Sequence, residues 1–390
     1  MIYLDNAATT WPKPPGVAEA VVRALRKYGA NPGRGGHKMS MAASGEVYRC
    51  RETAAKMFHL DDTSRVVFTL NCTMALNMVL KGILSDGGRV TVSDLEHNAV
   101  MRPLTALSPA VPIYDVAHVV PGDDEATVEN FRHAIVPSTR AIVCMHASNV
   151  FGTRLPIRRL GELAREKNLL FVVDGAQSGG VLPIDMQADQ IDFLCLAGHK
   201  GLYGPMGTGL LLSSGRFQLP TILEGGTGTQ SLLFEQPEEL PDRLESGTVN
   251  VPGICGLQAG MEWVMNHGTA GICRQETDRM TLAHDMLTRI PGIELYTPRP
   301  REDLCAPVLS INVKGLHSEE TAAALNRHGI AVRAGLHCAP TAHRVFGTVQ
   351  TGTVRLAPSA FTTRQEIEQT CRVLAQIARE GRSGSASKTI

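Results

Sequence analysis

Between residues 60 and 212, short apolar runs alternate with longer amphipathic stretches, and few chain topologies accommodate that pattern. The apolar runs are rich in β-branched residues and lie at 65–68, 89–92, 141–145 and 169–173. Helical spacing predicts a helix over 157–167, where Leu160, Leu163 and Ala164 share one face. Strands that alternate with helices are typical of βα units. The sequence therefore predicts an α/β fold with a mainly parallel sheet.

Two further apolar runs, 193–197 and 209–212, flank a glycine-rich segment and predict a hairpin-like pair. Beyond residue 244 the pattern changes to that of a small α+β unit. Helices are predicted over 254–267, 270–289, 319–328 and 365–379, and strands over 292–296 and 306–313.

A chain of 390 residues exceeds the size at which one hydrophobic core stops growing, so more than one domain is expected. We expect a large domain over 16–264 and a smaller C-terminal domain over 265–380. Residues 1–15 are expected to pack near the active site and the small domain. The Gly- and Ser-rich tail, 381–390, is expected to be disordered.

The charges balance, with 38 Lys plus Arg against 38 Asp plus Glu, so no net field favours nucleic acid or an anionic membrane. The N-terminus lacks the basic and apolar regions of a signal peptide, and no apolar run has membrane-spanning length. We therefore expect a cytoplasmic protein that binds neither nucleic acid nor membrane.

The nine cysteines contain no C-x-x-C pair, which argues against a disulfide framework and a structural metal site. Most are expected to be buried as small apolar residues. Cys338 differs, because its loop is rich in Gly, Pro and polar residues, which favours exposure.

Asp174 and Lys200 follow predicted strands, at the sheet edge where open α/β folds place ligands. Asp174 is either a helix-capping residue or the partner of a protonated ring nitrogen. Lys200 is either a solvated surface lysine or a desolvated amine that reacts with a carbonyl cofactor.

Anion donors are predicted at Cys72 and Thr73, which begin a helix, and at Thr248 in a Ser-Gly-Thr turn. An ordinary helix cap and a plain turn use the same residues. His97 can stack on a ring or be structural, and Asn149 can bond a ring hydroxyl or shape a turn.

Together these residues resemble the class V, fold-type I family of enzymes that depend on pyridoxal phosphate (PLP), and within it the cysteine desulfurases and selenocysteine lyases. The resemblance covers nearly the whole chain, in the family's order. Its motifs are YLDNAATT, ANPGRGGH, CTMALN, LEHNA, ASNVFGT, VVDGAQS, AGHKGLYGPMGTG, LESGTVN, RAGLHCAP and VRLAPS.

The resemblance implies roles for the cofactor residues. Lys200 would be the Schiff-base lysine, Asp174 the partner of the ring nitrogen, and His97 the stacked imidazole. Asn149 and Gln177 would lie near the ring hydroxyl.

The resemblance also places Thr73 and His199 at the phosphate. It further implies a homodimer with shared active sites, in which Thr248 reaches the other subunit's phosphate.

The resemblance further implies that Arg355, with Asn149 and Arg333, binds the substrate carboxylate, to which a planar guanidinium is suited. Cys338, in the short R-x-G-x-x-C form, would attack the substrate sulfur of L-cysteine, giving L-alanine and a persulfide for a sulfur-acceptor protein. Arg333 and His337 are expected to help lower the pKa of the Cys338 thiol.

Two other enzyme activities remain open within the PLP class: selenocysteine lyase, and an aminotransferase or β-lyase that acts on another amino acid. A binding protein that has lost catalysis is the non-enzymatic alternative. The chain departs from the family pattern at Ala197, Met74 and Leu336, where relatives often have serine, glutamate and histidine.

Overall fold

The computed structural model describes residues 1–33 and 36–386, with side chains as far as Glu380. Residues 34–35, inside the ANPGRGGH motif, lie outside this range. The centre of the fold is a seven-stranded sheet in the order β2-β8-β7-β6-β5-β3-β4. Its strands are β2 (Val66–Thr69), β3 (Arg89–Ser93), β4 (Tyr114–Ala117), β5 (Thr139–Met145), β6 (Leu170–Asp174), β7 (Phe193–Ala197) and β8 (Gly209–Ser213).

Among these seven described strands, β8 alone runs antiparallel to its neighbours, β2 and β7. The other pairings are parallel. The predicted mainly parallel sheet is therefore confirmed, and so is the antiparallel pair at 193–197 and 209–212. Strand β4, with a partly exposed Asp115, lacks a continuous apolar run and was not predicted.

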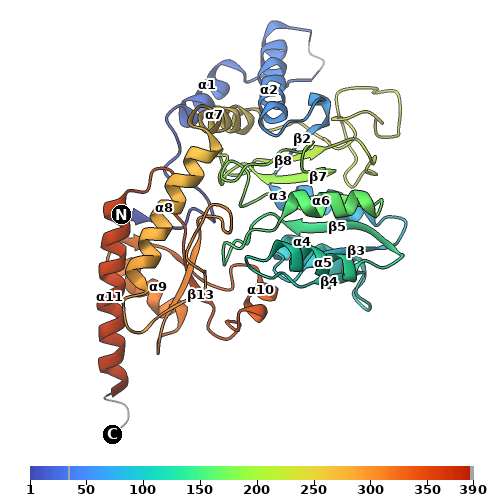
Figure 1. The fold of residues 1–390 in the computed structure, drawn as a ribbon. Helices are drawn as coiled ribbons and strands as arrows, with labels where there is room; N and C mark the ends of the chain where they lie inside the picture. The colour runs from blue at the N-terminus through green and yellow to red at the C-terminus, as the bar shows by residue number, and fades with distance from the viewer. Residues whose placement is uncertain (34–35, 387–390) are drawn as a thin grey trace.

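Helices cover both faces of the sheet (Figure 1). One face carries α3 (Cys72–Ile83) and α4 (Asn98–Leu107), and the other carries α1 (Val17–Lys27), α2 (Lys38–Met57), α5 (Asp124–Ala134), α6 (Ile157–Glu166) and α7 (Val251–His267). Neighbouring strand residues enter opposite cores, as Val172 and Val173 do. Because both faces are buried, the strands are continuously apolar in sequence.

The C-terminal part has its own core around a four-stranded antiparallel sheet in the order β12-β13-β10-β9. These strands are β9 (Ile293–Leu295), β10 (Leu309–Val313), β12 (Arg333–Gly335) and β13 (Thr353–Leu356). The helices are α8 (Thr269–Leu287), α9 (Ser318–Arg327), α10 (Pro340–Val345) and α11 (Arg364–Ala386). The smaller α+β unit is thus present. The expected boundary between 264 and 265 falls inside α7 and stays a prediction.

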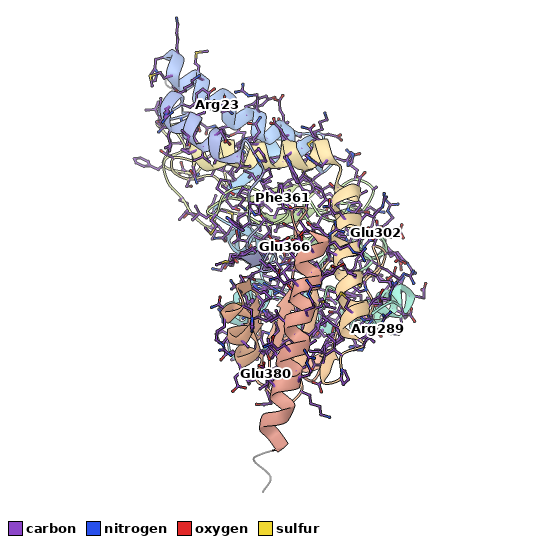
Figure 2. All side chains as sticks on the ribbon, turned by 90° about the vertical axis from the view of Figure 1, so that its left-hand side faces the viewer. Arg23, Arg289, Glu302, Phe361, Glu366 and Glu380 are labelled. Atoms are coloured by element: carbon purple, nitrogen blue, oxygen red, sulfur yellow. The ribbon has the colours of Figure 1, made fainter. Side chains whose placement is uncertain are left out.

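Helix α11 runs beside α8 on the outer side of this unit, as Figure 2 shows between Glu366 and Glu380. It continues to Ala386, and the expected disorder of the tail, 381–390, stays a prediction. Adding a residue to an existing helix costs far less than starting one, so glycine and serine do not end it. Residues 387–390 lie outside the described part. None of the described helices is long and apolar enough to cross a membrane.

The N-terminal segment connects the two sheets. Strand β1 (Ile2–Tyr3) pairs in parallel with β11 (Ile330–Ala331) beside the small sheet. Farther along, the Thr10 amide and hydroxyl both donate to the His199 carbonyl, at 3.1 and 3.2 Å. The segment therefore spans from the small unit to the loop that carries Lys200.

A buried acid lies where α8 meets that loop. Glu276 is 3% exposed and accepts a 3.4 Å hydrogen bond from the Tyr203 hydroxyl, which itself accepts from the Ala360 amide at 2.9 Å. Burial raises the pKa of Glu276 to about 8.

This raised pKa predicts a pH-dependent loss of stability. The folded state keeps Glu276 protonated while the unfolded state ionises, so its contribution is fully present below the unfolded pKa and is lost as the pH rises toward 8. The free energy of unfolding of the wild type should therefore decrease between about pH 5.5 and about pH 8. In Glu276→Gln, which has no group to ionise at this position, the decrease over the same range should be smaller by roughly 2 kcal/mol. Urea unfolding of both proteins measures this difference, and equal slopes would contradict it.

Candidate active site

The predicted cofactor residues follow the carboxyl ends of five mutually parallel strands, which meet at one edge of the large sheet. Cys72 and Thr73 follow β2, His97 follows β3, Asn149 follows β5, Asp174 ends β6, and His199 and Lys200 follow β7. Ligands in open α/β sheets bind at this edge, because loops from several strands converge there.

A cavity of about 90 Å³ opens at this edge. Its lining includes Cys72, Thr73, His97, Asn149, Asp174, Gln177, His199 and Lys200. The structure therefore brings together every predicted cofactor residue except Thr248. Arg333, Cys338 and Arg355 lie outside this lining and reach the site through the contacts described below.

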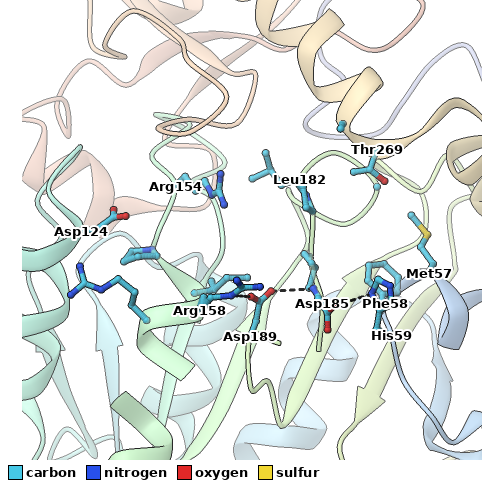
Figure 3. A pocket seen from close by; sticks show the side chains of 17 residues that line it. Met57, Phe58, His59, Asp124, Arg154, Arg158, Leu182, Asp185, Asp189 and Thr269 are labelled. Carbon is cyan, nitrogen blue, oxygen red and sulfur yellow. Dashed lines mark hydrogen bonds and ion pairs between the residues drawn. The ribbon is translucent and has the colours of Figure 1, made fainter. Parts of the chain in front are cut away.

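The largest described cavity, about 710 Å³, lies elsewhere and contains none of the predicted site residues (Figure 3). Two pairs of its charged groups contact each other: Arg158 contacts Asp189 at 3.2 Å, and His59 contacts Asp185 at 3.4 Å. Size alone would therefore select a cavity that lies away from the predicted site residues.

Lys200 and Asp174 are the central charged pair of the smaller cavity. Burial lowers the pKa of Lys200, and the nearby Asp174 carboxylate opposes this shift. Asp174 is 5% exposed, and its Oδ1 accepts from the Ala176 amide at 2.9 Å and from the Cys72 thiol at 3.4 Å. Burial raises the pKa of Cys72 well above its usual value, so the neutral thiol is a donor to this carboxylate.

The N-terminus of α3 supplies the predicted anion donors. The Asn71 side chain accepts from the Met74 amide at 2.9 Å, so it caps one of the amides that have no partner within the helix. The amides of Cys72 and Thr73 then remain available toward the cavity. A Cβ at Gly209 would approach the Asn71 backbone to 2.6 Å, so only glycine lets β8 pass this close to the turn.

Some polar side chains around the cavity have buried atoms without a hydrogen-bond partner among the described residues. Asn149 donates to the His337 carbonyl at 2.7 Å, while its buried Oδ1 has no partner among the described residues. His199 Nδ1 is also buried and has no hydrogen-bond partner among the described residues. Burial lowers the pKa of His199 to about 4. His97 Nδ1 accepts from the Ala99 amide at 3.0 Å, and burial lowers the pKa of its ring. Both imidazoles are therefore neutral near pH 7.

Cys338 is the one exposed cysteine, and the other eight are buried. Its carbonyl accepts a 2.7 Å hydrogen bond from the Asn98 amide, next to His97, so its loop is held at the rim of the cavity. His337 and Cys338 both adopt left-handed backbone conformations, with φ of 48° and 58°, which are uncommon for residues other than glycine.

The expected contribution of His337 to the reactivity of Cys338 is wrong. The His337 ring is buried, and Nε2 lies 2.9 Å from the Thr353 carbonyl oxygen. Burial lowers the pKa of His337 to about 3, so the ring carries no charge near pH 7. Arg333 and Arg355 are the charges that interact electrostatically with Cys338, so they can supply positive charge to a thiolate here.

Arg333 and Arg355 are cross-strand partners on β12 and β13, and both bind the carboxylate of Asp5. Arg355 is 2% exposed and also donates to the Asn149 carbonyl at 2.9 Å. Burial lowers the pKa of Arg355, and the Asp5 carboxylate opposes that shift. Arg355 therefore lies beside Asn149, but part of its guanidinium is already occupied.

Thr248 lies apart from the cofactor cavity. Its hydroxyl accepts from the Asn31 side chain at 3.2 Å, and it lines a separate hollow that also includes Gly226, Gly228 and His37. Within one chain it does not reach the other phosphate candidates.

Three residues near the site were not assigned a role from sequence: Asp5, Lys13 and Glu96. Lys13 donates to the His199 carbonyl at 2.9 Å, and burial lowers its pKa to about 8. Glu96 is fully buried, and burial raises its pKa to about 8. Asp5 and Glu96 lie within the motifs YLDNAATT and LEHNA, and Lys13 follows the first of them. Their roles were missed because the contacts of Asp5 with Arg355, of Lys13 with His199 and of Glu96 with Met145 join residues far apart in sequence.

Comparison with known proteins agrees with this geometry. The family model for aminotransferase class V matches residues 2–370. A probable cysteine desulfurase of Methanothermobacter thermautotrophicus is 32% identical, with 97% of this chain and 95% of the relative covered. One from Pyrococcus abyssi is 31% identical, with 98% and 96% covered.

Solved structures show the same relationship. A cysteine desulfurase from Thermococcus onnurineus superposes with a TM-score of 0.89 at 30% identity, covering 97% of this chain and 95% of that one. A cysteine desulfurase of Escherichia coli gives a TM-score of 0.85 at 27% identity, covering 97% and 94%. The chain therefore belongs to the class V aminotransferase family and has the fold of its cysteine desulfurases.

Proposed function

We propose that the protein is a PLP-dependent cysteine desulfurase, which converts L-cysteine to L-alanine and keeps the sulfur as a persulfide on Cys338. The observation that carries this proposal is the position of Cys338. It is the one exposed thiol, and its loop is bonded to Asn98 and Asn149 at the rim of the cavity that contains Lys200.

The residues present fit PLP. The buried Asn149 Oδ1 is a free acceptor, which suits a ring hydroxyl, and the Asp174 carboxylate suits a protonated ring nitrogen. The free amides of Cys72 and Thr73 at the start of α3, with neutral His199, suit a phosphate. When bound, PLP would supply a carbonyl for an amine and a ring that accepts electrons from the substrate α-carbon.

The protein groups have distinct tasks in this reaction. Lys200 holds the cofactor and then takes the α-proton. Its lowered pKa suits it to this second task, because a larger fraction of the amine is uncharged and can accept a proton. His97, a neutral imidazole in the cavity lining, would stack on the cofactor ring. Arg355 and Asn149 orient the substrate carboxylate, and Arg333 adds positive charge at the cavity rim.

Cys338 carries out the sulfur transfer. Its thiolate attacks the substrate sulfur, and the carbon–sulfur bond breaks with its electron pair left on the β-carbon. That carbon takes up the proton that the Cys338 thiol had released and becomes the methyl group of alanine, and Lys200 returns the α-proton. The products are alanine and a persulfide on Cys338, which is exposed and so accessible to a sulfur-acceptor protein.

We further propose a homodimer with shared active sites. Leu232 is 97% exposed and Phe234 fully exposed, in the segment that precedes Thr248, and such apolar exposure is typical of surfaces covered by a partner. In this arrangement Thr248 would complete the phosphate site of the second subunit.

The proposed activity is tested by incubating PLP-loaded protein with L-cysteine and a thiol reductant. We expect equal amounts of alanine and sulfide. Transfer of the amino group to a keto acid without sulfide would indicate an aminotransferase, and turnover of selenocysteine but not cysteine would indicate a selenocysteine lyase. Either result would contradict the proposal.

A further inference from the structure

Cys72 is a buried cysteine that contacts a charged group of the cofactor cavity. It lines that cavity, and its Sγ donates a 3.4 Å hydrogen bond to Asp174 Oδ1. Both residues are buried, so water competes little for this contact. Burial, and then the nearby Asp174 carboxylate, raises the pKa of the Cys72 thiol well above its usual value. The thiol therefore keeps the proton that it donates.

The two oxygens of the Asp174 carboxylate differ in their partners. Oδ1 accepts from the Cys72 thiol and also, at 2.9 Å, from the Ala176 amide. Oδ2 has no hydrogen-bond partner among the described residues, and Asp174 lines the cavity. Two donors on one oxygen fix the orientation of the carboxylate and leave the other oxygen for a ligand.

The backbone holds Cys72 in place for this contact. Cys72 is the first residue of α3, and the Asn71 side chain before it accepts from the Met74 amide at 2.9 Å. The Asn71 carbonyl accepts from the Thr69 hydroxyl at 3.0 Å, and β8 passes so close that a Cβ at Gly209 would lie 2.6 Å from the Asn71 backbone. The thiol therefore reaches Asp174, 102 residues away in sequence, from a fixed turn.

A second thiol shows that burial beside Asp174 does not by itself produce this contact. Cys195 is the cross-strand partner of Asp174 on β7 and is fully buried. Burial, and then the nearby Asp174 carboxylate, raises the pKa of the Cys195 thiol. Among the described residues, however, this thiol forms no hydrogen bond with that carboxylate. The contact of Cys72 is therefore a matter of direction as well as of proximity.

We propose that Cys72 is a positioning residue of the cofactor site: its thiol holds the Asp174 carboxylate ionised, with Oδ2 toward the cavity, and so keeps the proton of the PLP ring nitrogen on the ring. Hydrogen-bond donors to a carboxylate favour its ionised form. A ring that stays positively charged accepts electrons more readily. This inference rests on the proposed function only for the binding of PLP.

The test measures where the proton of the ring nitrogen lies, in protein without substrate. The wild type and the variants are loaded with PLP that carries the heavy nitrogen isotope in its ring, and the nitrogen chemical shift is measured by solid-state NMR. Free PLP in acid and in alkali gives the reference shifts of the protonated and the unprotonated ring. The wild-type shift should lie close to the protonated reference, and a shift at the unprotonated reference would overturn the proposal.

Three substitutions of Cys72 separate the hydrogen bond from the shape of the side chain. Cys72→Ala removes the donor, and Cys72→Val removes it while filling the space. In both, the equilibrium between protonated ring and protonated carboxylate should move toward the carboxylate by about fivefold, which displaces the nitrogen shift toward the unprotonated reference. Cys72→Ser keeps a hydroxyl donor and should retain the wild-type shift.

A wild-type shift in Cys72→Ala or in Cys72→Val, or an equally displaced shift in Cys72→Ser, would overturn the proposal. If Cys72→Ala fails to fold, Cys72→Val decides alone. The matched control is Cys195→Ala, which removes a buried thiol that lies beside Asp174 without bonding its carboxylate. Its shift should equal that of the wild type. A displacement as large as in Cys72→Ala would show that the loss of any neighbouring thiol moves the proton, against the proposal.

The outcome is separable from that of the proposed function, because no amino acid is turned over. Protein that shows the expected shifts but releases no alanine from cysteine would disprove the desulfurase activity and leave the role of Cys72 standing. Active protein whose Cys72 variants all keep the wild-type shift would overturn the role of Cys72 alone. Failure of the wild type to bind PLP would overturn both.

Discussion

Replacing Lys200 by alanine should lower alanine formation from cysteine by about 10³-fold or more. The reason is that this one amine is expected both to hold the cofactor covalently and to take the α-proton. The cavity offers no replacement amine, since Lys200 is the only lysine in its lining. Alanine release and the visible spectrum of the PLP-treated protein measure the two effects.

Lys56→Ala is the matched control, because Lys56 is an exposed lysine of α2 outside the cavity. It should keep both the activity and the cofactor spectrum. If Lys200→Ala retained the spectrum and the activity of the control, the assignment of the cofactor lysine would be wrong.

Replacing Cys338 by alanine should produce a different pattern. Alanine formation from cysteine should fall by about 10²- to 10³-fold, because no other thiol is exposed to take the sulfur. The cofactor spectrum should be unchanged, since Cys338 lies outside the lining of the cofactor cavity. Steady-state rates and absorbance spectra of the same preparation distinguish a lost nucleophile from a lost cofactor.

A control thiol is available in Cys371, which is buried between α11 and α8, with its sulfur 4.0 Å from the Ala283 carbonyl oxygen. Cys371→Ala should retain the activity apart from a modest loss of stability. Wild-type rates in Cys338→Ala would show that sulfur leaves without this nucleophile.

The large sheet was predictable because its strands are buried on both faces and are therefore continuously apolar. The same reasoning failed for β11 and β12, which have two and three residues and include Arg333 and Gly335. A strand of this length carries too few residues to establish a periodic pattern. Its position is decided by pairing with β1 and β13, which lie far away in sequence.

The cofactor cavity was predictable for a related reason. Its residues follow strand ends, and parallel strands bring their ends to one edge, so local patterns predict a shared site. The carboxylate site was only half predictable. Arg333 and Arg355 could be assigned by resemblance, but Asp5 is 328 and 350 residues away from them, and no local pattern reports such a contact.

The pKa values of the site also depend on burial that the sequence does not display. His337 follows Leu336 in an apparently polar loop, yet its ring is turned inward and is neutral near pH 7. Cys338, the next residue, is exposed. Two adjacent residues with left-handed backbones thus have opposite environments, which composition cannot reveal.

The central claim is that Cys338 receives the sulfur of cysteine. The most direct measurement is mass spectrometry of peptides from PLP-loaded protein that was treated with L-cysteine and then alkylated without reduction. We predict that the peptide containing Cys338 gains the mass of one sulfur atom, while those of the eight buried cysteines do not. Alanine formation with no added sulfur on Cys338, or with the sulfur on another cysteine, would contradict the account.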